Sequence, residues 1–308
     1  MGTTSNLFSQ APQVDALSQI ISNKHRFSKG LIEKGYAAFG DEWLQIFENM
    51  LQSLFPDPDS LALAVKGYAA FSFDSMRHQK AFERDRAYPH KTYAEVAEQV
   101  YFNEEHMENE YLPGLLLSHF LWPHHYRQLQ FFNSAFVLPM AQSDEQHFIE
   151  VGIGTMLYSR LVLENVTAAT GTGYDISPSS CRYAERHVKA ISAANRYQVC
   201  EQDIVANPVD SVPWIICVEV LEHLEDPVRF LVALRKTLKA GGRAFITAAI
   251  NSGHADHIYL YRGPEDVSRH LTEAGFHIEQ GFCATAYPPP GPDVPVPEAA
   301  AFVVYADR

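Results

Sequence analysis

One carboxylate and two glycines stand where an apolar run gives way to a helix-like segment. They are Glu150, Gly152 and Gly154, and the apolar run is 147–151. Glycines let a backbone approach a ligand closely, and the helix that follows presents its N-terminus to it. A dinucleotide fingerprint would need another glycine at position 157, where this chain has leucine. The spacing therefore leaves three alternatives: a dinucleotide site, a site for another adenosine-bearing molecule, or an ordinary turn.

Polar residues also end the next three apolar runs of this half of the chain. Asp175 lies about 20 residues after the turn, where a carboxylate can accept hydrogen bonds from ribose hydroxyls. Asp203 ends the third run, and the fourth passes into the segment CVEVLEHLEDP at 217–227. Four polar strand ends in order indicate a binding site much more strongly than two glycines alone.

From residue 147 onward, short apolar runs alternate with helical patterns. We predict strands at 147–151, 170–177, 197–204, 214–220, 243–250, 276–283 and 300–306, and helices at 178–194, 226–242 and 264–276. Such alternation predicts an α/β fold with a doubly wound, mostly parallel sheet of seven strands. The segment 286–298 has no helical pattern, so we expect the last strand to be antiparallel.

Residues 1–140 predict an all-α cap, followed by the sheet domain at 141–308. Helices are expected at 39–55, 59–76 and 92–122, the last with a bend near Pro113 and Gly114. Aromatic and histidine residues accumulate late in this half: Tyr101, His106, Tyr111, His119, Trp122, His124, His125, Tyr126, Phe131 and Phe132. They could form the core of the cap. Alternatively they form a lid over the site, in which His124 or Tyr126 deprotonates or positions a nucleophile.

The composition favours chemistry on small molecules. The chain has 308 residues and a formal net charge of −13, which disfavours a nucleic-acid partner. It has no apolar run long enough for a membrane span and no signal-peptide layout at its start. Its four cysteines lack C-x-x-C spacing, which predicts free thiols in a cytoplasmic protein and no zinc site. The sequence leaves a homodimer open.

Residues 147–308 resemble the class I S-adenosylmethionine-dependent methyltransferases. The segment EVGIGTM matches their first motif at its acid and first two glycines, and departs from it at Met156. The resemblance implies S-adenosylmethionine as the cofactor. It assigns the ribose to Asp175, the adenine to Ile176, Asp203 and Ile204, and the rest of the cofactor to Glu150, Gly152, Gly154 and Glu219. Glu219 and His223, which follow the fourth strand, are also candidate catalytic residues.

The segment EVLEHLEDP also resembles quinone O-methyltransferases and small-RNA 2′-O-methyltransferases. In those enzymes the matching Glu, Glu and His can hold a divalent metal, which would place one at Glu219, Glu222 and His223. His254 or His257 would supply a further ligand, and such a set suits Mg²⁺, Mn²⁺ or Fe²⁺ better than zinc. The same pattern is common where histidine packs and an acid caps a helix, so we predict no metal.

Three functions stay open from the sequence. The first is methyl transfer to an O, N or C nucleophile of a small metabolite. The second, by resemblance to azetidine-2-carboxylate-forming enzymes, is cyclisation of S-adenosylmethionine itself, with methylthioadenosine as the other product. The third is a non-catalytic protein that kept the fold.

Overall fold

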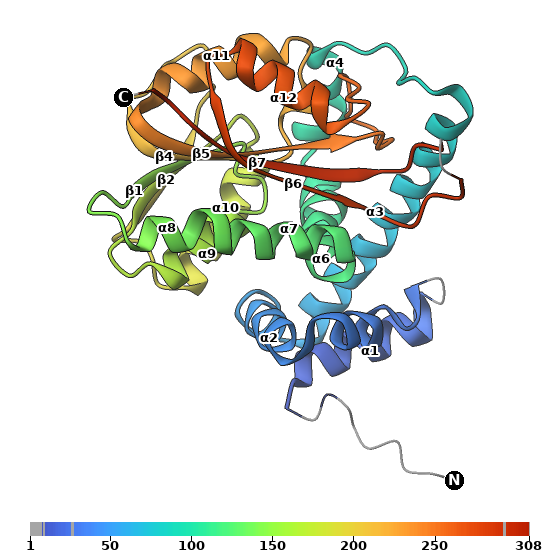
Figure 1. Ribbon diagram of the computed structural model, residues 1–308. Helices are drawn as coiled ribbons and strands as arrows, with labels where there is room; N and C mark the ends of the chain where they lie inside the picture. Colours follow the sequence, from blue (N-terminus) through green and yellow to red (C-terminus); the bar gives the residue numbers. More distant parts are fainter. Residues whose placement is uncertain (1–7, 9, 26–27, 292–293, 308) are drawn as a thin grey trace.

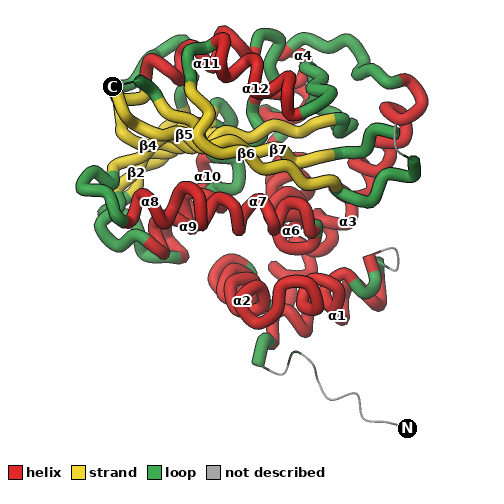
Figure 2. The backbone as a smooth tube through the Cα atoms, viewed as in Figure 1, coloured by secondary structure: helices red, strands yellow, loops and turns green. Residues whose placement is uncertain are grey.

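The computed structural model describes residues 8, 10–25, 28–291 and 294–307. A seven-stranded sheet forms its centre, with the strand order β3-β2-β1-β4-β5-β7-β6 (Figures 1 and 2). The strands are β1 (His147–Val151), β2 (Thr170–Asp175), β3 (Tyr197–Glu201), β4 (Val212–Cys217), β5 (Leu238–Ile250), β6 (His277–Thr285) and β7 (Glu298–Tyr305). All seven predicted strands are therefore present.

The sheet reverses its winding direction at β1, which lies between β2 and β4. The neighbouring pairs from β3 to β5 are parallel, whereas β7 is antiparallel to both β5 and β6. The hairpin-like return between β6 and β7 confirms the prediction of an antiparallel last strand. At such a reversal, the carboxyl ends of β1 and β4 diverge into a crevice that can hold a ligand.

Helices cover both faces of the sheet. α9 (Leu157–Asn165) and α10 (Pro178–Ala190) lie on one face, and α11 (Pro227–Thr237) and α12 (Pro264–Glu273) on the other (Figure 1). The predicted helix at 226–242 was too long. It ends at Thr237, and residues 238–242 extend β5 instead, where Leu238 pairs with Val212 of β4.

The first three helices, α1 (Pro12–Lys24), α2 (Leu31–Leu54) and α3 (Pro58–Asp85), build most of the cap. α2 is interrupted at Gly40, whose φ of 71° is rare for any residue with a side chain. α3 begins at Asp57, which accepts hydrogen bonds from the first backbone N–H groups of the helix. The indole of Trp43 is fully buried and donates to the carbonyl of Phe120, so α2 is fixed to the later cap helices.

The predicted long helix at 92–122 is divided at Asn103, a break that the sequence did not predict. The chain forms α4 (Tyr93–Val96) and the π-helix η2 (Ala97–Tyr101), and then opens at Asn103, whose φ and ψ are −85° and 90°. Helical geometry resumes in α5 (Glu104–His106), the π-helix η3 (Met107–Tyr111) and α6 (Leu112–Leu121). The helix runs through Pro113, because the wider π turn before it leaves room for a ring that cannot donate a backbone hydrogen bond.

The last cap segments already pack on the sheet. They are α7 (Pro123–Phe132), the π-helix η4 (Asn133–Val137) and α8 (Leu138–Ala141). Phe131 stacks on Phe282 of β6, and Phe132 meets Phe245 of β5 with ring centroids 4.8 Å apart. One hydrophobic cluster thus continues from the cap into the sheet. The domain boundary at 140 stays a prediction.

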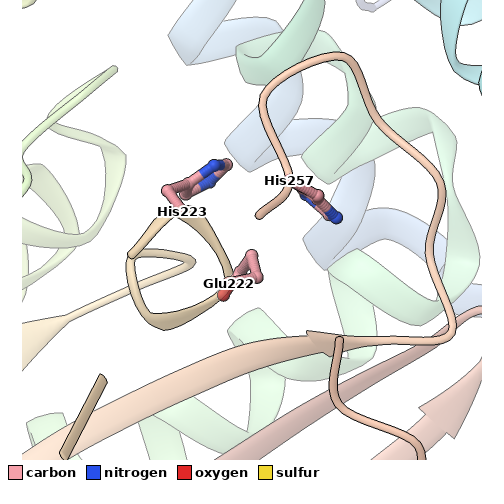
Figure 3. A group of neighbouring side chains, drawn as sticks. All are labelled: Glu222, His223 and His257. Atoms are coloured by element: carbon pink, nitrogen blue, oxygen red, sulfur yellow. The ribbon is translucent and has the colours of Figure 1, made fainter. Parts of the chain in front are cut away.

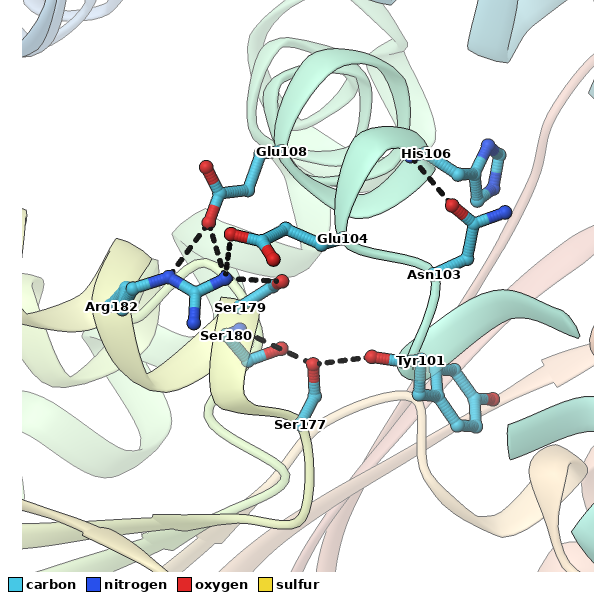
Figure 4. A network of polar contacts seen from close by, with 9 residues as sticks. All are labelled: Tyr101, Asn103, Glu104, His106, Glu108, Ser177, Ser179, Ser180 and Arg182. Atoms are coloured by element: carbon cyan, nitrogen blue, oxygen red, sulfur yellow. Dashed lines mark hydrogen bonds and ion pairs between the residues drawn. The ribbon is translucent and has the colours of Figure 1, made fainter. Parts of the chain in front are cut away.

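A polar clasp joins the middle of the cap to α10 (Figure 4). Arg182 donates to Glu108 at 2.8 Å and pairs with Glu104 at 2.9 Å. Close by, the hydroxyl of Ser177 donates to the carbonyl of Tyr101 at 2.9 Å. These contacts hold the segment around residue 101 over the carboxyl end of β2.

Candidate active site

A cavity of about 520 Å³ lies between the carboxyl edge of the sheet and the cap. Its floor is formed by the ends of β1, β2, β4 and β5, and its roof by α3, α6, α7 and the segment 101–111. Volumes of this size are typical of sites for small organic ligands. Three of the four strand ends that the sequence singled out, those of β1, β2 and β4, therefore face a space that the cap encloses.

The glycine turn after β1 leaves room for a ligand. Gly152 has a φ of 71°, and a Cβ there would come within 2.6 Å of Val220. Its N–H donates to the carbonyl of Tyr174, which ties the turn to β2. Gly154 has a φ of 42°, and a Cβ on it would meet nothing within 4 Å. Because Gly154 also lines the cavity, its bare backbone presents an open surface to a ligand.

Met156 occupies the left-handed position at which the family motif has its third glycine. Its φ and ψ are 58° and 15°, and α9 begins directly after it. A residue with a side chain loses roughly 1–2 kcal/mol in this conformation. The side chain of Met156 is fully buried in the main hydrophobic cluster, which offsets that cost. The departure from the motif therefore keeps the backbone of the turn and replaces the glycine by a core residue.

Backbone N–H groups fix the position of the Asp175 carboxylate. One carboxylate oxygen accepts the N–H of Gly154 at 3.0 Å and the other accepts the N–H of Ser177 at 2.9 Å. Burial raises the pKa of Asp175, and these backbone donors oppose the rise. Its side chain lines the cavity with Ile176 beside it. A carboxylate that still has free lone pairs next to an open glycine turn fits the ribose diol of S-adenosylmethionine.

Glu150 is buried at the end of β1 and also lines the cavity. Its carboxylate accepts both the backbone N–H of Ser159, at 3.0 Å, and the hydroxyl of the same residue. Burial raises the pKa of Glu150 to about 8, although the two hydrogen bonds from Ser159 lower it. Glu150 therefore carries a proton at neutral pH in the free protein, and it anchors α9 to β1.

Glu219 and Glu222 form a buried acidic pair after β4. Glu219 has a left-handed φ of 52°, and Thr247 of β5 holds it there. The Thr247 hydroxyl accepts the N–H of Glu219 at 2.8 Å and donates to its carboxylate at 2.6 Å. Burial raises the pKa of both carboxyl groups, and each group is a close neighbour of the other. Two adjoining buried carboxyls share a proton unless a cation lies between them.

Three side chains at this end could hold a divalent cation: Glu222, His223 and His257 (Figure 3). Their ligand atoms lie within 4.8 Å of one another. Nδ1 of His223 lies 3.1 Å from the carbonyl of Asp256, and Nδ1 of His257 lies 2.7 Å from that of Ser252. A carbonyl only accepts, so each Nδ1 carries the proton and each Nε2 keeps its lone pair, as a metal ligand requires.

The donor set therefore fits a divalent cation, which would act there as a Lewis acid. Glu222 adds an Oε2 that is buried and has no hydrogen-bond partner in the described protein. Glu219 belongs to a different contact, because its carboxylate binds Thr247. The sequence thus indicated Glu222 and His223 as possible metal ligands in one motif, and His257 as one of two candidates for a further ligand. The prediction that no metal is used remains to be tested.

Asp256 joins the cap to the loop after β5. It is almost completely buried, accepts the hydroxyl of Tyr111 at 2.8 Å and lies 3.4 Å from that of Tyr101. Burial opposes ionisation, but the neighbouring His223, His257 and His254 hold the pKa of Asp256 well below its usual range. Asp256 was not singled out from the sequence, because only folding brings it beneath the two tyrosines.

The part of the roof that α6 and α7 contribute, namely His119, His124, His125 and Gln128, carries no fixed charge. Burial lowers the pKa of His119 and His124 to about 4, and that of His125 well below its usual range. The three imidazoles are therefore neutral at pH 7. Gln128 donates to the hydroxyl of Tyr158 on α9 at 2.8 Å, which connects the roof to the glycine turn.

The cavity gathers most of the predicted site residues. Those that line it are Glu150, Gly152, Gly154, Asp175, Ile176, Glu219, Glu222, His223, His254, His257 and, from the cap, Tyr101, Tyr111, His119, Trp122, His124 and His125. Their assigned roles stay predictions. This placement favours a lid for those cap residues over a purely structural core.

Three candidate residues do not line the cavity. Tyr126 is buried against Phe39 and Phe120, and this placement does not support a catalytic role for it. Asp203 is exposed, and its carboxylate caps the turn that follows β3 by accepting the N–H of Val205 at 2.8 Å. Ile204 is packed in the second hydrophobic cluster. Their proposed contacts with adenine remain untested.

Several lining residues were missed by sequence reasoning, including Phe71, Gln128, Thr155, Tyr158 and Asp256. Gln128 carried one usable signal, because it follows His124 by one helical turn and so shares its face of α7. For the other missed residues, whether the side chain reaches the cavity depends on how the cap packs on the sheet, which no local pattern indicates.

The methyltransferase expectation agrees with similarity to known proteins. Residues 149–244 match the family described as "Methyltransferase domain". The chain is 30% identical over 122 residues to a ubiquinone biosynthesis O-methyltransferase of Coxiella burnetii (strain Dugway 5J108-111), covering 40% of this chain and 51% of that protein. A protein of the same name from Xanthomonas oryzae pv. oryzae (strain PXO99A) is 28% identical over 132 residues, covering 42% of this chain and 54% of that protein. The chain thus spans about half the length of these relatives.

The solved structure of the mitomycin 7-O-methyltransferase MmcR is similar in fold over a larger part of the chain. It covers 83% of this chain and 75% of its own, with a TM-score of 0.53 and 14% sequence identity. The matched family, the strand order 3-2-1-4-5-7-6 and the open glycine turn beside Asp175 agree with one another. Over residues 149–244 the chain is therefore similar to methyltransferase domains, its sheet domain shares the fold of the methyltransferase MmcR, and S-adenosylmethionine is the cofactor that its glycine turn fits.

Proposed function

We propose that the protein transfers the methyl group of S-adenosylmethionine to an O, N or C nucleophile of a small metabolite. The observation that carries this proposal is the single cavity that joins the glycine turn to the roof. A small acceptor bound under the roof would face a methyl group presented from the turn. The cap would exclude water, so that positioning and desolvation supply most of the catalysis.

The charges of the lining support a small acceptor that is not an anion. Among the described lining residues there are several carboxyl groups but no lysine or arginine. Phosphate groups and nucleic acids are bound through such cations, so this cavity disfavours them. In the described part of the chain, no helix has the length and apolar character needed to cross a bilayer. This finding agrees with the absence of a long apolar run in the sequence.

Product analysis tests this proposal. Purified protein is incubated with S-adenosylmethionine, with and without a pool of small metabolites, and the nucleoside products are identified by mass spectrometry. We expect S-adenosylhomocysteine whose formation depends on the added metabolites. Failure to bind S-adenosylmethionine at millimolar concentration in calorimetry would reject catalysis and favour the non-catalytic alternative.

A second candidate is cyclisation of S-adenosylmethionine to azetidine-2-carboxylate and methylthioadenosine. It needs a closed cavity with aromatic walls and a means of keeping the α-amine unprotonated. The aromatic side chains of Phe71, Tyr111 and Trp122 and the neutral roof histidines favour it. Methylthioadenosine formed from S-adenosylmethionine alone would select this candidate over methyl transfer.

We propose that neither reaction requires a metal. The acidic pair of Glu219 and Glu222 can be neutralised by a shared proton, so a cation is not needed to balance it. Activity should therefore survive exhaustive EDTA treatment. Loss of activity that Mn²⁺ restores in the wild type, but not in His257→Ala, would instead show that Glu222, His223 and His257 hold a working metal ion.

A further inference from the structure

Of the buried polar atoms in the cavity lining that have no hydrogen-bond partner in the described protein, two lie on α7. They are Oε1 of Gln128 and Nδ1 of His124. Gln128 is 1% exposed and His124 is 7% exposed, and both side chains line the cavity. A buried polar atom that stays unpaired is costly, so a native protein retains one chiefly where a partner arrives during function.

The chemistry of these two atoms narrows the choice of partner. The amide nitrogen of Gln128 donates to the hydroxyl of Tyr158, so its oxygen remains an acceptor. His124 is neutral because burial lowers its pKa, and with its proton on Nε2 it accepts at Nδ1. The residues are one helical turn apart and share a face of α7. The roof thus offers two neighbouring acceptors to the cavity.

We propose that this subsite binds the reacting group of the substrate and that this group is an amine. A primary amine can donate one N–H to Gln128 and one to His124, and its lone pair remains free to attack. A hydroxyl has only one hydrogen and would leave one acceptor unpaired. A carboxylate has no hydrogen to donate, and no lysine or arginine is available in the described lining to bind its charge.

The ionisable side chains near Gln128 and His124 also favour a neutral amine in this subsite. The titratable side chains around the two acceptors are Arg127, whose positive charge acts on His124, and five others: His119, His125, Tyr158, Glu150 and Glu219. Burial disfavours the charged form of all five. The surroundings therefore stabilise a neutral nitrogen better than an ammonium ion, which has no lone pair to attack with.

The amine can have two sources, and each gives a balanced reaction. If it belongs to a second substrate, its lone pair forms a bond to the methyl carbon and the S–CH₃ bond breaks with its electrons on sulfur. If it is the α-amine of S-adenosylmethionine, it bonds to the γ-carbon and methylthioadenosine leaves. In both reactions the proton lost by nitrogen passes to Nδ1 of His124 and then to water. This inference rests on the proposed function, since both reactions consume S-adenosylmethionine.

The first arm of the test measures binding to the complex of the full chain with S-adenosylhomocysteine. Calorimetry compares n-propylamine, n-propanol and propionate, together with their butyl and hexyl homologues, at several pH values, and the affinity of each amine is referred to the concentration of its neutral form. The second arm incubates the protein with S-adenosylmethionine alone and measures methylthioadenosine. We expect the amines to bind about tenfold or more tightly than the alcohols and acids in the first arm, or methylthioadenosine to form in the second.

Variants connect either result to the two acceptors. If the amine belongs to a second substrate, Gln128→Leu should reduce amine affinity by about tenfold or more while S-adenosylhomocysteine binds as before. If it is the α-amine of S-adenosylmethionine, the variant should reduce methylthioadenosine formation by about tenfold or more and also weaken the binding of S-adenosylhomocysteine, which carries the same amine. Gln128→Glu keeps an acceptor oxygen and should retain the function, which excludes a folding defect as the cause. Gln130→Leu is the matched control, because Gln130 is exposed on the same helix.

Equal binding of amines and alcohols, with no methylthioadenosine in the second arm, would overturn the inference. So would an amine-dependent signal that Gln128→Leu leaves intact. Both outcomes leave the proposed function standing, provided S-adenosylhomocysteine binds. Absence of that binding would instead reject the proposed function, and the subsite with it.

Discussion

The glycine-turn end of the cavity and its roof differ in whether their buried polar groups already have hydrogen-bond partners. At the glycine-turn end, both oxygens of Asp175 accept backbone N–H groups before any ligand arrives. In the roof, Gln128 and His124 each keep a buried atom without a partner in the described protein. The first end is organised as we predict for S-adenosylmethionine. The second has hydrogen-bonding capacity left for the molecule that distinguishes this protein.

The largest effect should come from removing the carboxylate at the glycine-turn end. Asp175→Ala should weaken S-adenosylmethionine binding by about a hundredfold or more, because hydrogen bonds to a charged acceptor are lost at both ribose hydroxyls. Calorimetry measures the change in Kd. Asp203→Ala is the comparison, since Asp203 does not line the cavity and should matter less. An unchanged Kd for Asp175→Ala would show that the ribose lies elsewhere.

The second-largest effect should come from changing Met156, whose backbone completes the glycine turn. Met156→Gly restores the glycine of the family motif and removes the left-handed strain, worth about 1–2 kcal/mol. It also deletes a fully buried side chain, a change that costs about 2–5 kcal/mol in protein cores. We therefore expect a net loss of roughly 2 kcal/mol in the free energy of unfolding, measured with urea. Met156→Leu, which keeps most of the volume, should lose less, and a gain in stability for the glycine variant would contradict this account.

The two ends should also respond to pH with opposite signs. The folded-state pKa of Glu150 is about 8, above its ordinary value of 4.5. Its contribution to stability is therefore full below pH 4.5 and is lost as the pH rises through 8. His119 and His124 have folded-state pKa values of about 4, below 6.5, so their contribution is present above pH 6.5 and is lost as the pH falls through 4.

Thermal unfolding across the pH range tests this difference in sign. Glu150→Gln should flatten the alkaline side of the Tm profile, and His119→Asn the acid side, each by about 2 °C or more. His147→Asn serves as the control, since His147 is exposed. The same pH dependence in all three variants would mean that other groups set the profile.

The smallest effect is expected at the polar clasp, in which Arg182 of α10 pairs with Glu104 and Glu108 of the cap. Arg182 is half exposed, and ion pairs of that kind contribute less than about 1 kcal/mol. Arg182→Ala should therefore lower the free energy of unfolding only slightly, and high salt should reduce the difference further. A loss above about 2 kcal/mol in urea titrations would show that the clasp, rather than the shared hydrophobic cluster, holds the cap in place.

Local sequence patterns were sufficient to predict the strands of the sheet and the residues at the glycine-turn end of the cavity. The spacing of Glu150, Gly152, Gly154 and Asp175 follows from one strand-turn-helix unit and the strand beside it. Such units depend on contacts between neighbouring segments, so a sequence pattern can indicate them. The same reasoning did not predict the break at Asn103 in the helix at 92–122, and it did not predict the π turn that accommodates Pro113.

The sequence by itself indicated a doubly wound, mostly parallel sheet, the expected cofactor and the acidic positions at the strand ends, since each depends on residues that are close along the chain. Only the tertiary structure decided which cap side chains line the cavity. Tyr126 and Gln128 lie on the same helix, yet one is packed into the cap and the other opens to the cavity. That difference depends on how α7 is rotated against β5 and β6, through contacts between residues more than a hundred positions apart, such as Phe131 with Phe282. No local pattern encodes such a rotation, because packing against a distant surface selects it.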